Sequence, residues 1–131
     1  MNITLLIANT LLFLAFIIHT IVGDKELHSI QPDSDSDTNF LKTEKWTMAR
    51  CGWHWISIDL LFGTIILGLI NFTQILENEK LLLQLMSIYF FCYAIVWTFI
   101  IFISRKFPNN YWKLSQWLLL LLISLLIYSG I

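Results

Sequence analysis

Four long apolar runs with few charged side chains dominate this sequence and restrict what it can fold into. The first run, from Asn2 to Gly23, contains no charged residue at all. A helix needs about 20 apolar residues to cross the roughly 30 Å hydrocarbon layer of a bilayer. Backbone polar groups inside lipid must be satisfied within their own segment, which makes helices the expected form. The predicted membrane spans are residues 3–22, 46–76, 81–104 and 114–131.

The composition is consistent with lipid as the solvent for most of the chain. Of its 131 residues, 57% are hydrophobic and 13% are charged, whereas soluble domains contain about 25% charged residues. A soluble domain this small has too much surface to hide so many apolar side chains. We therefore predict a single all-α domain, an integral membrane four-helix bundle with antiparallel up-down topology. The net charge of −1 argues against a nucleic-acid partner, which selects for a basic face.

The positions of Lys and Arg indicate how the spans are oriented. Most of these residues lie in the segments 24–45 and 105–113, whereas Lys80 alone lies in the connection between the second and third spans. Because Lys and Arg are enriched in cytoplasmic loops, we expect the loop 24–45 in the cytoplasm and both termini outside or in the periplasm. The expected location is the inner membrane of the cell. An aromatic belt is expected at the cytoplasmic boundary, formed by Trp46, Tyr111, Trp112 and Trp117.

The long loop and the two cysteines carry little specific chemistry. Residues 31–37 are acidic and rich in serine, a composition typical of a mobile, solvated loop. Their alternating aspartates resemble the start of a calcium loop, but the glycine and the terminal glutamate of such a loop are missing. Cys51 and Cys92 both lie in apolar runs, so we interpret them as small buried hydrophobic residues.

Ionisable side chains inside the spans mark candidate sites, because each costs roughly 2.5–3.5 kcal/mol on insertion scales. The second span holds Arg50, His54 and Asp59. At 100° per residue, Arg50 and His54 share a face with Ser57, and Asp59 lies on the opposite face. This one helix therefore presents two polar stripes.

The first span offers matching groups. His19, Gly23 and Glu26 are spaced i, i+4, i+7 and share a face if the helix continues past the glycine. In an antiparallel pair of the first two spans, His19 and Arg50 would each lie about 6 Å inside their helix ends, at about 1.5 Å per residue. We therefore expect a polar cluster at the cytoplasmic ends of these spans, made of His19, Glu26, Arg50 and His54, with His28 as a fifth member.

Several roles are open for this cluster. Arg50 could extend to lipid phosphates at the interface, or form an ion pair with Glu26 that locks two helices. His19 and His54 could be neutral hydrogen-bonding residues between helices. The same two histidines could instead be ligands of a transition metal or a haem.

Asp59 is the deepest charged residue of the second span and lies near the expected midplane. Asn9 in the first span lies at a similar depth, so a hydrogen bond between them is the simplest expectation. The functional alternative is a protonatable carboxylate in a transport path, which with four spans would require an oligomer.

One pattern resembles a known group of proteins. His19 is followed by Gly23 and Glu26, and after the loop Arg50 precedes a Trp53-His54 pair. This arrangement resembles small four-span bacterial membrane proteins with a His-x3-Gly-x2-Glu … Trp-His pattern, and the likeness covers roughly the first 60 residues. The resemblance implies the four-span architecture and implies that His19, Glu26 and His54 act together. It implies no reaction.

The sequence contains no catalytic motif, and whether the protein is an enzyme stays open. The favoured hypothesis is a non-catalytic subunit or accessory module whose polar cluster binds a lipid headgroup or a partner. Its expected partners are the bilayer, a second copy of the chain or another membrane protein. The alternatives are a membrane metalloprotein or haem protein that uses His19 and His54, and an oligomeric transporter or pore component that uses Asp59.

Overall fold

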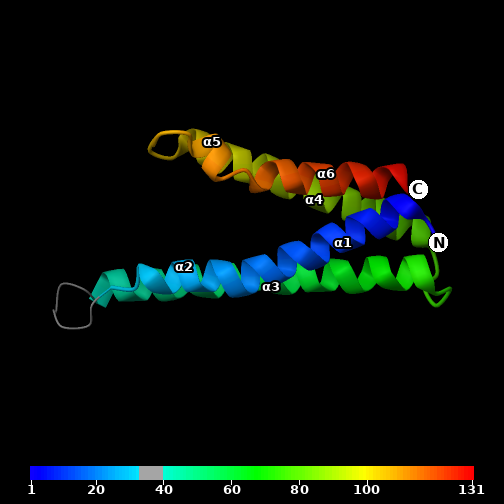
Figure 1. Ribbon diagram of the computed structural model, residues 1–131, viewed down its shortest axis with the longest axis horizontal. Helices are drawn as coiled ribbons and strands as arrows, with labels where there is room; N and C mark the ends of the chain where they lie inside the picture. Colours follow the sequence, from blue (N-terminus) through cyan, green and yellow to red (C-terminus); the bar gives the residue numbers. More distant parts are fainter. Residues whose placement is uncertain (33–39) are drawn as a thin grey trace. The chain divides into compact units, whose positions relative to one another are not determined.

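The computed structural model describes residues 1–32 and 40–131, and most of them are helical (Figure 1). No strand occurs in these two ranges, so the expected all-α class is confirmed for them. The aspartates of the acidic stretch, Asp33, Asp35 and Asp37, lie outside the described residues, and so does the mobile loop predicted for 31–37 apart from its first two residues. The chain divides into two compact units, described separately: unit 1 is Met1–Asn9 with Ile66–Ile131, and unit 2 is Thr10–Ile65. The single domain stays a prediction.

The first helical segment is longer than its predicted span. It consists of α1 (Ile3–Ile17), a π-helical turn η1 (Ile18–Gly23) and α2 (Asp24–Ser29), which follow one another without a break. The loop expected from residue 24 therefore begins only after Ser29. Gly23 adopts ordinary helical angles, φ −65° and ψ −35°. Lys25, Glu26 and Leu27 after it are good helix formers, and the first proline comes at position 32.

Helix α3 (Phe40–Phe72) is displaced toward the N-terminus relative to the expected 46–76. It begins earlier because residues 41–45 favour a helix although they are too polar to count as a membrane span. It ends earlier because the chain must reverse before the next helix. Asn78 makes the final turn with a left-handed φ of 56°.

One face of α3 is consistently less exposed than the others. Its positions alternate in steps of four and three: Trp46, Arg50, Trp53, Ser57, Leu60, Thr64, Leu67 and Asn71. A repeat of 3.5 residues keeps one face of a helix against its neighbours. In unit 2 this face meets the first helical segment in antiparallel register, because His19 pairs with Ser57 and Leu27 pairs with Trp46 (Figure 1).

In unit 1, α4 (Glu79–Ile103) and α6 (Gln116–Ser129) lie side by side, joined through the short α5 (Asn110–Lys113). They are antiparallel, since Ser87 meets Ser124 and Trp97 Nε1 donates to the Leu114 carbonyl at 3.1 Å. The two serines are buried and bond reciprocally. Ser87 Oγ donates to the Ser124 carbonyl at 3.0 Å, and Ser124 Oγ donates to the Ser87 carbonyl at 2.8 Å.

Asn2 ties three helices together at one end of unit 1. Its backbone N–H donates to Asn71 Oδ1 at 2.6 Å, and its side-chain amide donates to the Gly130 carbonyl at 3.0 Å. Asn71 is 8% exposed, and its Nδ2 has no hydrogen-bond partner among the described residues. A buried donor left without a partner costs about 1–3 kcal/mol.

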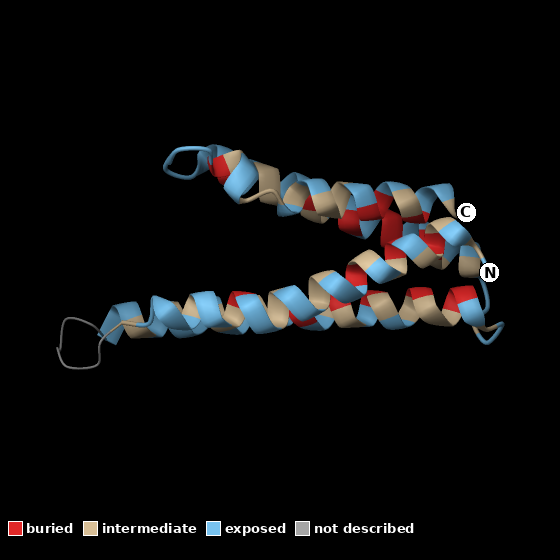
Figure 2. Cartoon of the chain, in the orientation of Figure 1, coloured by how far each residue is buried: buried red, intermediate tan, exposed pale blue. Residues whose placement is uncertain are grey.

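Within residues 1–32 and 40–131, three helical stretches are long and apolar enough to cross a membrane: Ile3–Ser29, Phe40–Phe72 and Glu79–Ile103. The fourth expected span, 114–131, corresponds to α6, an apolar helix of 14 residues. Much of the helix surface is exposed (Figure 2), including large apolar side chains. Cys51 and Cys92 are free and exposed, so their expected burial is wrong. Cys51 lies beside the inward stripe of α3, not on it.

Candidate functional site

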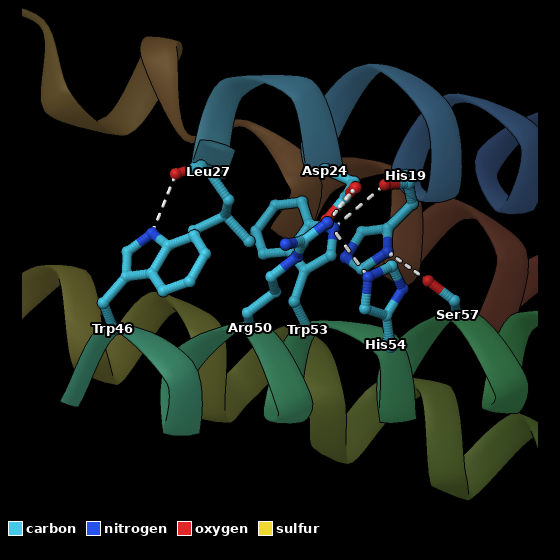
Figure 3. A network of polar contacts seen from close by, with 8 residues as sticks. All are labelled: His19, Asp24, Leu27, Trp46, Arg50, Trp53, His54 and Ser57. Atoms are coloured by element: carbon cyan, nitrogen blue, oxygen red, sulfur yellow. Dashed lines mark hydrogen bonds and ion pairs between the residues drawn. The ribbon is translucent and has the colours of Figure 1, made fainter. Parts of the chain in front are cut away.

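Asp24 is the centre of a polar cluster in unit 2 (Figure 3). Arg50 donates to its carboxylate in a bidentate arrangement, Nε to Oδ1 and Nη2 to Oδ2, each at 2.7 Å. His54 Nε2 lies 3.1 Å from the same Oδ1. Because an ionised carboxylate only accepts hydrogen bonds, the network assigns the proton of His54 to Nε2.

The three side chains that meet at Asp24 are partly exposed to solvent. The side chains of Asp24, Arg50 and His54 are 25%, 35% and 42% exposed, respectively. Ion pairs in contact with solvent contribute little net stability unless their geometry is good. The fork of Arg50 matches the carboxylate atom for atom, which fixes the direction of approach as well as the distance. The arrangement therefore specifies how the two helices meet.

His19 lies next to the triad and belongs to the π-helical turn. Its imidazole stacks on the Trp53 indole, with ring centroids 4.0 Å apart and planes 6° from parallel. His19 Nδ1 is 3.0 Å from Ser57 Oγ. Gly23 allows this packing, because a Cβ built on it would meet Trp53 Cε2 at 2.8 Å and Cζ2 closer still.

Two tryptophans of α3 bind backbone carbonyls of the first helical segment. Trp46 Nε1 donates to the Leu27 carbonyl and Trp53 Nε1 to the His19 carbonyl, both at 2.9 Å. N–H groups of a π-helical turn reach back five residues instead of four. Such a shift changes which carbonyls remain available to side chains, and the His19 carbonyl lies within η1. Arg50 also lies over the Trp46 ring, 5.4 Å from its centroid.

These side chains join α3 to the first helical segment. We call them the hairpin clasp: His19, Asp24, Trp46, Arg50, Trp53, His54 and Ser57 (Figure 3). Their donors and acceptors are directed across the hairpin at three levels, around residues 19, 24 and 27 of the first segment. The clasp is therefore a continuous seam along the hairpin.

The structure brings together three of the four residues of the predicted cluster. Arg50 and His54 share Asp24, and His19 lies on the neighbouring Trp53. Glu26 is exposed, and the contact it makes within the described chain is through its backbone carbonyl, which accepts from Ser29. His28 is exposed as well.

The acidic partner of Arg50 is thus Asp24, which the sequence reasoning missed. In a regular α-helix, Glu26 would share the face of His19, and Asp24 would lie about 140° away. The π-helical turn takes in roughly one more residue than an α-helical turn. That extra residue rotates the next part of the helix, so Asp24 and Leu27 turn toward α3 and Glu26 turns away.

Asp59 lies on α3 outside its inward stripe and is half-buried. It belongs to unit 2, whereas Asn9 belongs to unit 1. Their pairing therefore stays a prediction.

The hairpin clasp does not present its histidines as a ready metal site. His54 Nε2 is bonded to Asp24 and His19 Nδ1 to Ser57. Among residues 1–32 and 40–131, no group of three or more His, Cys, Asp or Glu side chains is arranged to hold a metal ion. Ser57 and His19 have the spacing of a nucleophile and a base, but Ser57 is 3% exposed, which closes its hydroxyl to a substrate.

Comparison of the chain with models of known families gives no match, and comparisons with curated proteins and with solved structures give none either.

Proposed function

We propose that the chain is a non-catalytic integral membrane protein, an accessory module or subunit that crosses the inner membrane four times. Its long helices expose large apolar side chains, including Trp55, Phe62 and Phe102. In water such a surface would favour aggregation. Lipid tails solvate it without cost, which supports the bilayer as the medium.

The fourth crossing rests on α6. Its 14 residues would cover about 21 Å at 1.5 Å per residue, less than the roughly 30 Å of the hydrocarbon layer. A short span is accommodated by local thinning of the bilayer or by flanking residues that extend to the interface. The close antiparallel packing of α6 on α4 supports a crossing, because it places α6 alongside a helix that is long enough to cross.

The observation that carries the proposed role is the use of the clasp's polar groups. Arg50 and His54 are directed at Asp24, and the indole donors of the clasp are directed at backbone carbonyls, so the seam binds the hairpin together. A catalytic centre would instead direct such groups at an open space for a substrate. The clasp thus fixes the two helices of the hairpin relative to each other and so holds the surface that they present in one arrangement.

That surface carries exposed lysines near the expected cytoplasmic boundary, interspersed with the exposed Glu26 and Glu44. Lys25 and Lys42 are exposed there, and Lys45 forms an ion pair with Glu44 at 3.4 Å. Each basic side chain close to an anionic leaflet contributes about 1 kcal/mol to attraction. A rigid hairpin with this charge can bind anionic headgroups or the acidic surface of a membrane partner.

Topology mapping tests the four-span arrangement. Single cysteines introduced as Lys42→Cys, Asn78→Cys and Asn109→Cys, in a variant with Cys51→Ser and Cys92→Ser, are labelled with an impermeant maleimide in intact cells. We expect Asn78→Cys to label from outside, and the other two only after permeabilisation. Labelling of Asn78→Cys and Asn109→Cys from the same side would contradict the proposal.

An absorbance spectrum with elemental analysis of the purified protein separates this role from the metalloprotein alternative. A non-catalytic module carries neither a Soret band nor a stoichiometric transition metal. Either signal, if lost in a His54→Gln variant, would overturn the proposed role in favour of a metal or haem centre.

A further inference from the structure

A second charged surface lies in unit 1, where the chain passes from α4 to α6. We call residues 104–115, which include α5, the α4–α6 connection. Its basic side chains, Arg105, Lys106 and Lys113, are all exposed, as is every residue from 104 to 109 (Figure 2). The connection shares no residue with the clasp. It is therefore a separate surface with a charge of its own.

The positive charge of this connection is not neutralised within unit 1. The acidic residues of unit 1 are Glu77 and Glu79, and no acidic residue follows them in the sequence. They lie at the opposite end of α4, whose 25 residues extend over about 37 Å at 1.5 Å per residue. Charges in solvent are screened beyond about 8 Å at physiological ionic strength. By contrast, Lys45 near the clasp is paired with Glu44.

The backbone of the connection is held against the two long helices of unit 1. Trp97 Nε1 of α4 donates to the Leu114 carbonyl at 3.1 Å, and Trp117 Nε1 of α6 donates to the Tyr111 carbonyl at 3.3 Å. Asn110 between these points is buried. The connection is thus attached from both sides by groups that carry no charge, and its basic side chains remain available to a partner.

Exposed aromatic side chains lie among the basic ones. Trp112 is 73% exposed, and Phe107 is exposed as well. Trp and other amphipathic aromatic residues favour the level of the lipid headgroups, where one end of the ring is apolar and the other is wet. The last residues of α4, Phe102 and Ile103, are also exposed and apolar. The basic surface is therefore continuous with a surface suited to lipid tails, which favours a membrane over a soluble acidic partner.

We infer that the α4–α6 connection binds anionic phospholipids of the leaflet at its side of the membrane. Arg105, Lys106 and Lys113 contact the phosphates, and Trp112 and Phe107 lie between the headgroups. The inference rests on the proposed function in one respect, the placement of this connection at a membrane surface. It goes beyond that function because it assigns the selection of anionic lipid to unit 1 and not to the lysines near the clasp.

Lipid retention tests the inference. The full chain is placed in nanodiscs of equal amounts of phosphatidylcholine and phosphatidylglycerol, released into detergent, and examined by native mass spectrometry. We expect phosphatidylglycerol to be retained in preference. Each basic side chain contributes about fivefold to this preference, so the triple variant Arg105→Gln, Lys106→Gln, Lys113→Gln should reduce it by about a hundredfold. Equal retention of the two lipids by the unchanged protein would overturn the inference.

Two comparisons locate the effect in the chain. Lys106→Gln should reduce the preference by about fivefold, whereas Lys80→Gln, at an exposed lysine next to Glu79, is the matched control and should change it by less than about twofold. The second comparison is a triple variant of the lysines near the clasp, Lys25→Gln, Lys42→Gln, Lys45→Gln. If that variant loses the preference and the triple variant of the connection keeps it, the inference is wrong and the proposed role of the hairpin stands.

Trp112 reports directly on the lipids beside the connection. Its contribution to the fluorescence is the part lost in a Trp112→Phe variant, and bromine atoms on a nearby lipid chain quench it. In the same lipid mixture, brominated phosphatidylglycerol should quench this part more strongly than brominated phosphatidylcholine. About 1 M salt, which shortens the screening length to about 3 Å, should remove the difference. Equal quenching at low salt would contradict the inference.

Two further measurements keep the conclusions separate. The triple variant of the connection should retain the circular dichroism spectrum of the unchanged protein, because its backbone is attached by Trp97 and Trp117. Alkaline carbonate extraction tests the membrane proposal by itself. Protein that stays in the membrane pellet but shows no preference for phosphatidylglycerol contradicts only the lipid-binding surface.

Discussion

Asp24 holds Arg50 across the first helix hairpin by two parallel hydrogen bonds of 2.7 Å, with His54 as a third donor to the same carboxylate. The two partners come from α2 and α3, and the fork of the guanidinium matches the carboxylate in only a narrow range of orientations. The pair therefore sets the rotation and the register of α3 against the first helical segment. Its main contribution is specificity of packing, since both side chains are partly exposed.

Removal of either member of this pair should loosen the hairpin. Asp24→Asn retains the shape but loses the charge, and Arg50→Lys retains the charge but loses the fork. We expect both variants to lower the midpoint of thermal unfolding in detergent, followed by circular dichroism. The double variant should lose less than the sum of the two, because the residues act together.

The matched control is the neighbouring carboxylate. Glu26→Gln should change the free energy of unfolding by less than about 0.5 kcal/mol, as is usual for an exposed position. An effect of Glu26→Gln as large as that of Asp24→Asn would show that Arg50 is paired with Glu26, as a regular helix would have it.

This distinction marks what the sequence could predict about the site. Arg50, His54 and Ser57 lie on one face of α3 by simple periodicity, because α3 is a regular helix with an inward repeat of 3.5 residues. The facing helix is not regular. Because of the π-helical turn at η1, Asp24 faces α3 in place of Glu26. No residue type in the run Ile18–Gly23 predicts that turn. One extra residue in a single helical turn does not change the spacing of the apolar residues enough to be recognised in the sequence.

The helix limits differ for another reason. Hydropathy detects where a segment is apolar, and so it placed α4 within two residues of its observed limits, because there helix and apolar run coincide. At Phe40 and Ser29 the helices extend into polar sequence, where charged residues with good helix propensity continue the structure beyond the apolar run. The limits of an apolar run and the limits of a helix therefore need not coincide, and they differ at the helix ends that carry the clasp.

Gly23 should be the most sensitive glycine of the hairpin. A Cβ at this position overlaps the Trp53 ring, so Gly23→Ala must displace the indole and with it the His19 stack. Overpacking of this kind costs about 1–3 kcal/mol of unfolding free energy. Titration of the variant with sodium dodecyl sulfate measures that loss.

Gly52 offers a control in the same hairpin, since a Cβ built on it has nothing within 4 Å. Gly52→Ala should be neutral, or should stabilise α3 by about 0.5–1 kcal/mol through its better helix propensity. Equal losses at Gly23 and Gly52 would mean that backbone flexibility, and not the contact with Trp53, explains the first effect.

The reciprocal serine pair of unit 1 predicts a strong dependence on side-chain size. Ser87 and Ser124 are buried, and each donates to the other's carbonyl, so the helices approach closely there. Ser87→Ala should cost about 0.6 kcal/mol, the average for hydrogen bonds between membrane helices. Ser87→Leu should cost at least about 1–3 kcal/mol because the backbones must separate. The exposed Ser129→Ala is the control, and a harmless Ser87→Leu would contradict the close packing of α4 on α6.

His19 combines two interactions that different substitutions can separate. Its imidazole stacks on Trp53, and its Nδ1 shares a hydrogen bond with the buried Ser57. His19→Phe keeps a ring for the stack but loses the hydrogen bond, whereas His19→Gln keeps a hydrogen-bonding group but loses the stack. Each should lower the free energy of unfolding by about 0.5–1.5 kcal/mol. Ser57→Ala should match His19→Phe, and the double variant should add nothing further, because both changes remove the same bond.

A metal ligand would behave differently: both His19 variants would lose the metal together, and Ser57→Ala would keep it. Unfolding titrations and elemental analysis of the same purified samples therefore show whether His19 serves packing or a metal.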